Sequence, residues 1–251
     1  MKVGDNTVLI TGGATGIGFA LAEVFVQEGS EVILCGRRRS KLQQAKTKIP
    51  TAHVRKCDVS VESERRKLLR WITTSFPRLD MLVNNAGIQR QVDFTSPKIA
   101  RRTLPANDEL AINLEATIRM CALFAPKFIV KKRAAIVNIS SGLAFVPIAE
   151  MPIYCATKAA IHSFTTSLRH QLRDTSVRVF EAIPPTTDTE LDANFAGDQE
   201  EAYRGISPEE VAAAIIDGLK DDKEEIVIGQ AQGLQKASMK DPQRIFNQLN
   251  N

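Results

Sequence analysis

The sequence has 251 residues, of which 43% are hydrophobic and 25% are charged. This is the composition of an ordinary globular protein, and a chain of this length buries a sizeable core without disulfides or structural metals. The formal net charge of +4 is small for such a chain. The basic residues form short local clusters rather than one long stripe, so no nucleic-acid partner is expected.

The four cysteines, Cys35, Cys57, Cys121 and Cys155, form no Cys-x-x-Cys pair, so we expect no metal site. Most of them stand in apolar runs, which is typical of the buried, reduced thiols of a cytoplasmic protein. The opening stretch MKVGDNTVLITGG lacks the extended apolar region of a signal peptide. No run of about 18 apolar residues predicts a membrane span.

Strand-like and helix-like segments alternate along the chain. Short apolar runs that end in turn residues indicate strands, and apolar residues that recur every three or four positions indicate helices. The expected strands cover residues 7–13, 31–37, 52–59, 79–87, 135–142, 176–185 and 224–229. The expected helices cover residues 15–29, 41–49, 61–76, about 106–131, 152–174 and 207–219.

This alternation predicts an α/β fold with right-handed crossovers, in which helices cover both faces of a parallel sheet. We expect a single doubly wound, Rossmann-like domain over residues 1–251, with about seven strands. No linker and no internal repeat divides the chain. Residues 230–251 are expected to form a polar C-terminal tail with one short helix near Asp241.

The turn after the first strand reads TGGATGIG, residues 11–18. Glycines there let the backbone turn tightly and approach a ligand, and the following helix points its N–H groups and positive dipole end at that ligand. A pyrophosphate is the expected occupant, and the alternative is a glycine-rich turn without a ligand. The candidate cofactor-binding residues of this turn are Gly12, Thr15, Gly16, Ile17 and Gly18.

The end of the second strand bears on the choice of cofactor. Sites that bind a free ribose 2′-hydroxyl tend to place an acid about 20 residues after the glycines, but this chain has Gly36 there, followed by three arginines. Arginine can hold a 2′-phosphate, which favours NADP and makes NAD less favoured. Arg37 is the first candidate and Arg38 the second. Alternatively, the arginines only begin a solvated helix.

Tyr154 and Lys158 stand four residues apart in the helix expected over 152–174. Residues at this spacing share one helical face, and a nearby cation favours the phenolate and lowers the pKa of a tyrosine. Such a pair can donate and accept a proton near neutral pH. The spacing alone is common by chance, so the rest of the sequence must support it.

Four motifs occur in order: the glycine turn, NNAG (84–87), ISS (139–141) and YCATK (154–158). Together they resemble the short-chain dehydrogenase/reductase family, and the amino-acid sequence around the motifs resembles that of the DltE-type bacterial oxidoreductases. The resemblance covers nearly the whole chain. It implies an NAD(P)-dependent oxidoreductase that acts on CH–OH or C=O groups of a small-molecule carbonyl or alcohol, and the arginines after the second strand make NADP the preferred cofactor.

The resemblance also implies the catalytic roles. Tyr154 is the expected general acid in reduction and general base in oxidation, and Lys158 lowers its pKa and holds the nicotinamide ribose. Ser141, rather than Ser140, hydrogen-bonds the substrate oxygen. Asn113 anchors a water that passes protons to Lys158. Taken alone, Asn113 is equally compatible with helix packing, and Ser141 with a cap at a strand end.

Further cofactor contacts follow from the same resemblance. The expected adenine contacts are Asp58 and Val59, the expected ribose and sheet-floor contacts are Asn85, Ala86 and Gly87, and the expected nicotinamide-side contacts are Pro184, Thr187 and Thr189. The chain departs from the family pattern in two places. Pro185 replaces a common glycine, and Thr15 stands where NADP-preferring relatives often carry a base.

Several alternatives and partners complete these expectations. A catalytically silent NADP-sensing or scaffold protein on the same fold is the main rival, and an NAD-linked alcohol dehydrogenase is another. His162 is interpreted as a packing or subunit-interface residue and Trp71 as a core residue. An acidic segment, 187–205, is the expected lid over the substrate. A homodimer or homotetramer that pairs through the helices at 106–131 and 152–174 is expected.

Overall fold

The computed structural model describes residues 1–96, 109–191 and 205–250. Its centre is a seven-stranded sheet in the order β3-β2-β1-β4-β5-β6-β7, and each strand pairs in parallel with its neighbours. This confirms the predicted fold class. The strands are β1 (Thr7–Thr11), β2 (Glu31–Gly36), β3 (His53–Lys56), β4 (Met81–Asn84), β5 (Ala134–Ile139), β6 (Val177–Ile183) and β7 (Glu225–Val227).

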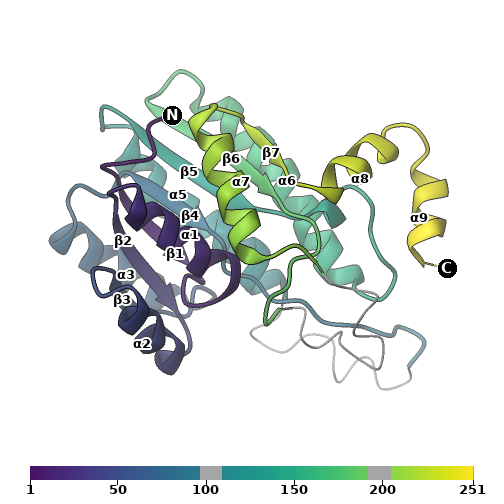
Figure 1. The fold of residues 1–251 in the computed structure, drawn as a ribbon, viewed down its shortest axis with the longest axis horizontal. Coiled ribbons are helices and arrows are strands. Elements are labelled where there is room, and N and C mark those ends of the chain that lie inside the picture. The colour runs from purple at the N-terminus through teal and green to yellow at the C-terminus, as the bar shows by residue number, and fades with distance from the viewer. Residues whose placement is uncertain (97–108, 192–204, 251) are drawn as a thin grey trace.

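Helices cover both faces of this sheet (Figure 1). On one face, α1 (Gly16–Gln27), α2 (Arg39–Lys48) and α7 (Pro208–Lys220) bury their apolar sides in a core cluster that contains Val8, Ile10 and Phe180. On the other, α3 (Glu62–Ser75), α5 (Ala116–Phe128) and α6 (Pro152–Leu172) share a second cluster with Leu9 and Val179. Because neighbouring strand residues point to opposite faces, one sheet supplies both clusters.

The strand order reverses beside β1, which pairs with β2 on one side and β4 on the other. In open parallel sheets, ligands bind outside the carboxyl ends of the strands at such a reversal. The glycine turn follows β1 at this point, and the motifs NNAG and ISS follow β4 and β5 at the same edge. The topology therefore gathers the predicted site residues at one edge of the sheet.

Two predicted segments need correction. The helix expected over about 106–131 begins, within the described residues, as a π-helix over Leu110–Glu115 that continues into α5, and residues 106–108 lie outside the described part. A π-turn inserts one extra residue, which periodicity does not reveal. The polar tail holds two helices rather than one, α8 (Gln230–Ser238) and α9 (Pro242–Asn250), which lie beyond β7 in Figure 1.

Two other features agree with the sequence. All four cysteines are buried and unpaired. No helix in the described ranges is long and apolar enough to cross a bilayer. Of the expected lid, residues 192–204 lie outside the described part of the chain.

Candidate active site

The glycine turn has the backbone shape of a ligand cradle. Gly12 and Gly16 have φ values of +64° and +54°, which side-chain-bearing residues rarely adopt. A Cβ on Gly12 would come within 2.9 Å of the Ala86 Cα, and a Cβ on Gly18 would come within 2.5 Å of the side-chain nitrogen (Nδ2) of Asn85. Thr15 is the N-cap of α1, yet its side chain makes no capping hydrogen bond. The first N–H groups of α1 are thus not capped by this side chain.

The carboxyl end of β4 is bonded to this turn. The backbone N–H groups of Asn85 and Ala86 donate to the Thr11 hydroxyl over 3.0 and 3.1 Å, and the Asn85 side chain donates to the carbonyls of Thr11 and Gly12. These bonds hold the NNAG segment against the glycine turn. They also explain why a larger residue than glycine at position 12 or 18 would collide with it.

The arginines after β2 differ in what they contact. Arg37 is exposed and its side chain forms no hydrogen bond or ion pair with another described residue, whereas Arg38 donates to the Thr15 hydroxyl over 3.2 Å and to Glu190 over 2.7 Å. A Cβ on Gly36 would meet nothing closer than Leu42, at 3.9 Å, so packing does not require glycine there. The space beside the arginines therefore holds no carboxylate from β2.

The other expected cofactor residues lie along the same edge. Asp58 follows β3 and accepts hydrogen bonds from Ser60, and Val59 beside it is buried. Thr189 lies over the glycine turn, because a Cβ on Gly16 would meet its methyl group at 3.2 Å. The remaining expected residues, Ile17, Pro184 and Thr187, stand at the start of α1 and just after β6.

Tyr154 and Lys158 lie on the first turns of α6, and both are only 6% exposed. The Lys158 Nζ is 5.5 Å from the centroid of the Tyr154 ring and donates to the Ile139 carbonyl over 2.9 Å. Burial lowers the pKa of Lys158 to about 8, and the carboxylate of Glu181 acts in the opposite direction. An ammonium of this kind is held beside a phenol, as the spacing predicted.

Asn113 stands in the π-helix and is buried. Its side chain accepts from the Ile88 N–H over 2.9 Å and donates to the Ile88 carbonyl and to the Thr157 hydroxyl. Gly87 connects it to the lysine: a Cβ there would lie 3.5 Å from the Asn113 side-chain oxygen and 3.9 Å from the Lys158 Nζ. The structure thus brings Asn113, Lys158 and Tyr154 together around the end of β4.

Ser141 lies two residues after the Ile139 carbonyl that binds Lys158 and is 8% exposed. Its hydroxyl accepts from the Leu143 N–H over 3.2 Å, which is the cap-like contact considered as an alternative. The backbone N–H of Gly142 donates to Pro184, so the ISS segment is bonded to the turn after β6. Pro185 in that turn packs near Gly229, at the start of α8.

Comparison with known proteins agrees with this arrangement. A model of the short chain dehydrogenase family matches residues 6–200. The chain belongs to the short-chain dehydrogenase/reductase family. It is 47% identical over 250 residues to the "Uncharacterized oxidoreductase DltE" of Bacillus subtilis, a match that covers 100% of this chain and 98% of that relative. This short-chain dehydrogenase is therefore DltE-like.

Two solved structures share the fold. A short chain dehydrogenase from Burkholderia cenocepacia in complex with NADP has a TM-score of 0.82 and 25% identity, over the full length of both chains. A short chain dehydrogenase/reductase from Burkholderia phymatum in complex with NAD has a TM-score of 0.81 and 21% identity, over 100% of this chain and 97% of that one. The neighbours thus include complexes of both cofactors.

The dehydrogenase fold also contains a buried ion pair that the sequence did not predict. His162, expected in packing or at an interface, places Nδ1 2.8 Å from the carboxylate of Glu181, which is fully buried on β6. Glu225 on β7 is the register partner of Glu181 and lies close to both His162 and Glu181. Its carboxylate is also 3.8 Å from the Arg169 guanidinium. The only signal in the sequence was a glutamate inside the apolar run VFEAI of this strand.

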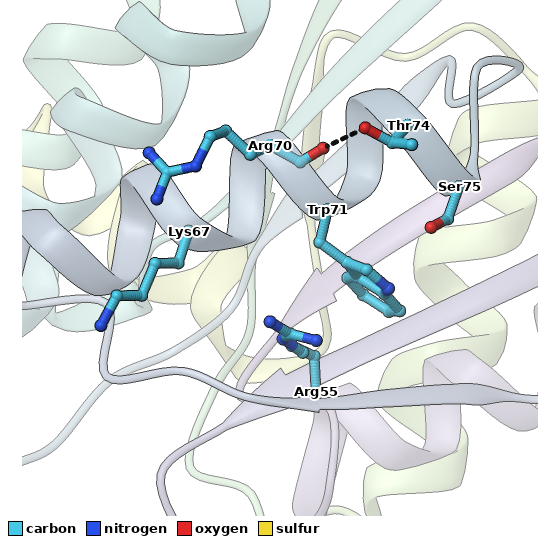
Figure 2. A pocket seen from close by; sticks show the side chains of 6 residues that line it. All are labelled: Arg55, Lys67, Arg70, Trp71, Thr74 and Ser75. Carbon is cyan, nitrogen blue, oxygen red and sulfur yellow. Dashed lines mark hydrogen bonds between the residues drawn. The ribbon is translucent and has the colours of Figure 1, made fainter.

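Trp71 needs a further correction, because it is half-buried rather than in the core. It lines a surface hollow of about 380 Å³ between β3 and α3, shown in Figure 2, and the Arg55 guanidinium lies 5.1 Å from its ring. Arg55, Lys67 and Arg70 make this hollow basic. None of its lining residues belongs to the site built above.

The His162–Glu181 pair generates a prediction. The hydrogen bond that the His162 imidazole donates to the Glu181 carboxylate raises the pKa of His162 above its ordinary value near 6.5. Because folding raises this pKa, the pair stabilises the fold fully below about pH 6.5, and that contribution is lost as the pH rises through the raised value. In urea unfolding, we expect the stability advantage of wild type over Glu181→Gln to shrink as the pH rises above about 6.5 and through the raised pKa of His162.

Imidazole NMR titration supplies the check on this assignment. The pKa of His162 is expected to fall in Glu181→Gln, since the carboxylate that favours the imidazolium is gone. An unchanged His162 pKa in that variant would contradict the pairing.

Proposed function

We propose that this protein is an NADP(H)-dependent oxidoreductase that transfers hydride between nicotinamide and a carbonyl or secondary-alcohol substrate. The observation that carries the proposal is the buried Lys158 ammonium, held by the Ile139 carbonyl beside the Tyr154 ring. Burying a cation is costly unless it is paired or hydrogen-bonded. Buried titratable groups with a shifted pKa are therefore common at functional sites. Here the Lys158 ammonium lies next to the glycine cradle in a member of an oxidoreductase family.

The residues of the turn fit a dinucleotide. Gly12 and Gly18 let the turn pack directly against Ala86 and Asn85, and the N-terminus of α1 offers N–H groups and a positive dipole end to a pyrophosphate. When bound, the nicotinamide supplies or accepts the hydride. We propose that the adenosine half of the dinucleotide is lined by Asn85, Ala86, Gly87, Asp58 and Val59. Its nicotinamide half is proposed to be lined by Pro184, Thr187 and Thr189.

The chain's own groups move the proton. In reduction, the Tyr154 hydroxyl is proposed to give its proton to the substrate oxygen as the carbonyl carbon accepts hydride. Ser141 hydrogen-bonds that oxygen and orients it. The Lys158 ammonium favours the ionised phenol that remains. Asn113, already bonded to the Ile88 backbone, orders the solvent side of Lys158, through which the phenol regains a proton. Oxidation runs the same steps backwards.

The preference for NADP rests on this chain, because the solved neighbours include complexes of both cofactors. Gly36 leaves no carboxylate where a free 2′-hydroxyl would need one. Arg38 lies beside Thr15 of the glycine turn, and its planar guanidinium suits a 2′-phosphate. Arg37, the first candidate from the sequence, becomes the second, because within the described residues only Arg38 of the two is bonded to the glycine turn.

The catalytic assignment predicts two different defects. Tyr154→Phe keeps the ring and loses one hydroxyl, so we expect it to bind NADPH while turnover falls by about 10²–10⁴-fold. Lys158→Met is expected to weaken both cofactor binding and turnover, because the ammonium serves the ribose and the tyrosine. NADPH consumption with a panel of ketones and aldehydes, alongside NADPH binding, separates the two effects.

Two results of that experiment would count against the proposal. Near wild-type turnover in Tyr154→Phe would refute the proton-transfer role. Tight NADPH binding by wild type with no turnover of any panel member would favour the silent, NADP-sensing alternative.

The cofactor assignment predicts that wild type binds NADPH more tightly than NADH. A lost charge-assisted hydrogen bond typically costs about 1.5–3 kcal/mol, so Arg38→Ala is expected to weaken NADPH binding by about tenfold or more and to leave NADH nearly unchanged. Arg37→Ala is the matched comparison, with a smaller expected effect. Equal affinities of wild type for the two cofactors, measured by calorimetry, would exclude the preference.

We also propose a homodimer or homotetramer, working in the cytoplasm. The exposed side of α6 carries small residues such as Ala156, Ala159 and Ser163, which permit close helix approach. The buried, unpaired cysteines suit a reducing compartment. Light scattering is expected to give at least twice the 27.6 kDa of one chain. A monomer at working concentration would contradict this assembly.

A further inference from the structure

Glu190 bridges two cations beside the glycine turn. Its carboxylate accepts a hydrogen bond from Arg38 over 2.7 Å and another from Lys41, the third residue of α2. Arg38 also donates to the hydroxyl of Thr15, the N-cap of α1. Thus two cations bind a single anionic group that lies 152 positions further along the chain than Arg38, and Arg38 links this group to Thr15 of the glycine turn.

The backbone holds Glu190 in this place. Thr189, the preceding residue, lies against Gly16 at the start of α1, and its hydroxyl accepts from the Leu191 N–H over 3.2 Å. The bonds from Lys41 and Arg38 lower the pKa of Glu190, so it is a carboxylate at neutral pH. The carboxylate is therefore an anion positioned by the fold beside Arg38 and Lys41, which follow Gly36 in the chain.

We propose that Glu190 occupies the position of the cofactor's 2′-phosphate, that Lys41 binds this phosphate together with Arg38 and Thr15, and that NADP must displace the carboxylate to bind. This rests on the proposed function and deepens it. NAD carries a neutral 2′-hydroxyl there and does not need to displace Glu190. Glu190 is therefore a specificity-determining residue that narrows the preference for NADP over NAD.

Charge favours the 2′-phosphate over the Glu190 carboxylate as the anion that Arg38 and Lys41 bind. A phosphate monoester carries about −1.5 to −2 charges near pH 7 and three acceptor oxygens, against one charge and two oxygens for a carboxylate. The pairs with Arg38 and Lys41 are partly exposed, at 55% and 32% of those side chains, and exposed ion pairs are weak. The phosphate can thus replace Glu190, at a cost in affinity that removal of the carboxylate would recover.

The test measures cofactor binding without turnover. Calorimetry gives the dissociation constants of NADPH, NADH, 2′,5′-ADP and 5′-AMP for wild type and Glu190→Gln, and the two fragments differ only in the 2′-phosphate. We expect Glu190→Gln to bind NADPH and 2′,5′-ADP about three- to tenfold more tightly, and to bind NADH and 5′-AMP within about twofold of wild type.

Two further variants sharpen the test. Glu28→Gln is the matched control, because Glu28 forms a similar exposed ion pair with Lys220 away from this site, and it should change no affinity. Lys41→Gln should weaken the binding of NADPH and 2′,5′-ADP and leave the binding of NADH unchanged. In the Lys41→Gln background, Glu190→Gln should recover less affinity than it does in wild type, since the two side chains interact directly.

The outcomes separate this inference from the proposed function. If Glu190→Gln leaves NADPH binding unchanged or weakens it, Glu190 does not compete with the phosphate, and the inference is overturned even where NADP is preferred. If wild type prefers NADH but Glu190→Gln still shifts the ratio toward NADPH, the inference stands and the proposed preference falls. If neither cofactor nor either fragment binds, both are wrong.

Discussion

The hydrogen bond from the Lys158 ammonium to the Ile139 carbonyl connects the two halves of the site. It joins the start of α6 to the carboxyl end of β5, two residues before Ser141. A buried cation has few alternatives to such a bond, because leaving it unpaired in a low-dielectric interior is costly. Tyr154, one turn earlier on α6, is carried to the same edge of the sheet.

A row of polar side chains beneath this edge supports the same alignment. Asn84, Asn138, Glu181 and Glu225 are register partners across β4, β5, β6 and β7. Asn84 bonds Asn138 and Cys121 of α5, Asn138 bonds Thr165 of α6, and Glu181 bonds His162 of α6. Hydrogen bonds are directional, so they restrict how α6 slides and rotates on the sheet more than apolar contacts do.

The opposite wall of the site depends on glycine instead of charge. Gly12 and Gly18 pack directly against Ala86 and Asn85, so the turn after β1 and the end of β4 lie as close as backbones can. This closeness leaves the start of α1 at the carboxyl edge of the sheet, and Arg38, after β2, bonds Thr15 there. Rigid apolar packing on both faces of the sheet thus supports a polar edge that carries the residues of the proposed site.

Local patterns in the sequence determined the seven strands, the parallel sheet, the glycine turn and the shared helical face of Tyr154 and Lys158. Each of these follows from spacing along a few residues, such as the four positions between Tyr154 and Lys158. Three contacts were decided only by the tertiary structure. Glu190 bonds Arg38 and Lys41, and His162 pairs with Glu181. Asn113 stands in a π-helix and bonds the Ile88 backbone. These contacts join residues that are far apart in the sequence, and an isolated Glu, His or Asn carries no local pattern that names its partner. Their positions depend on how the crossovers pack, which spacing along one segment cannot express.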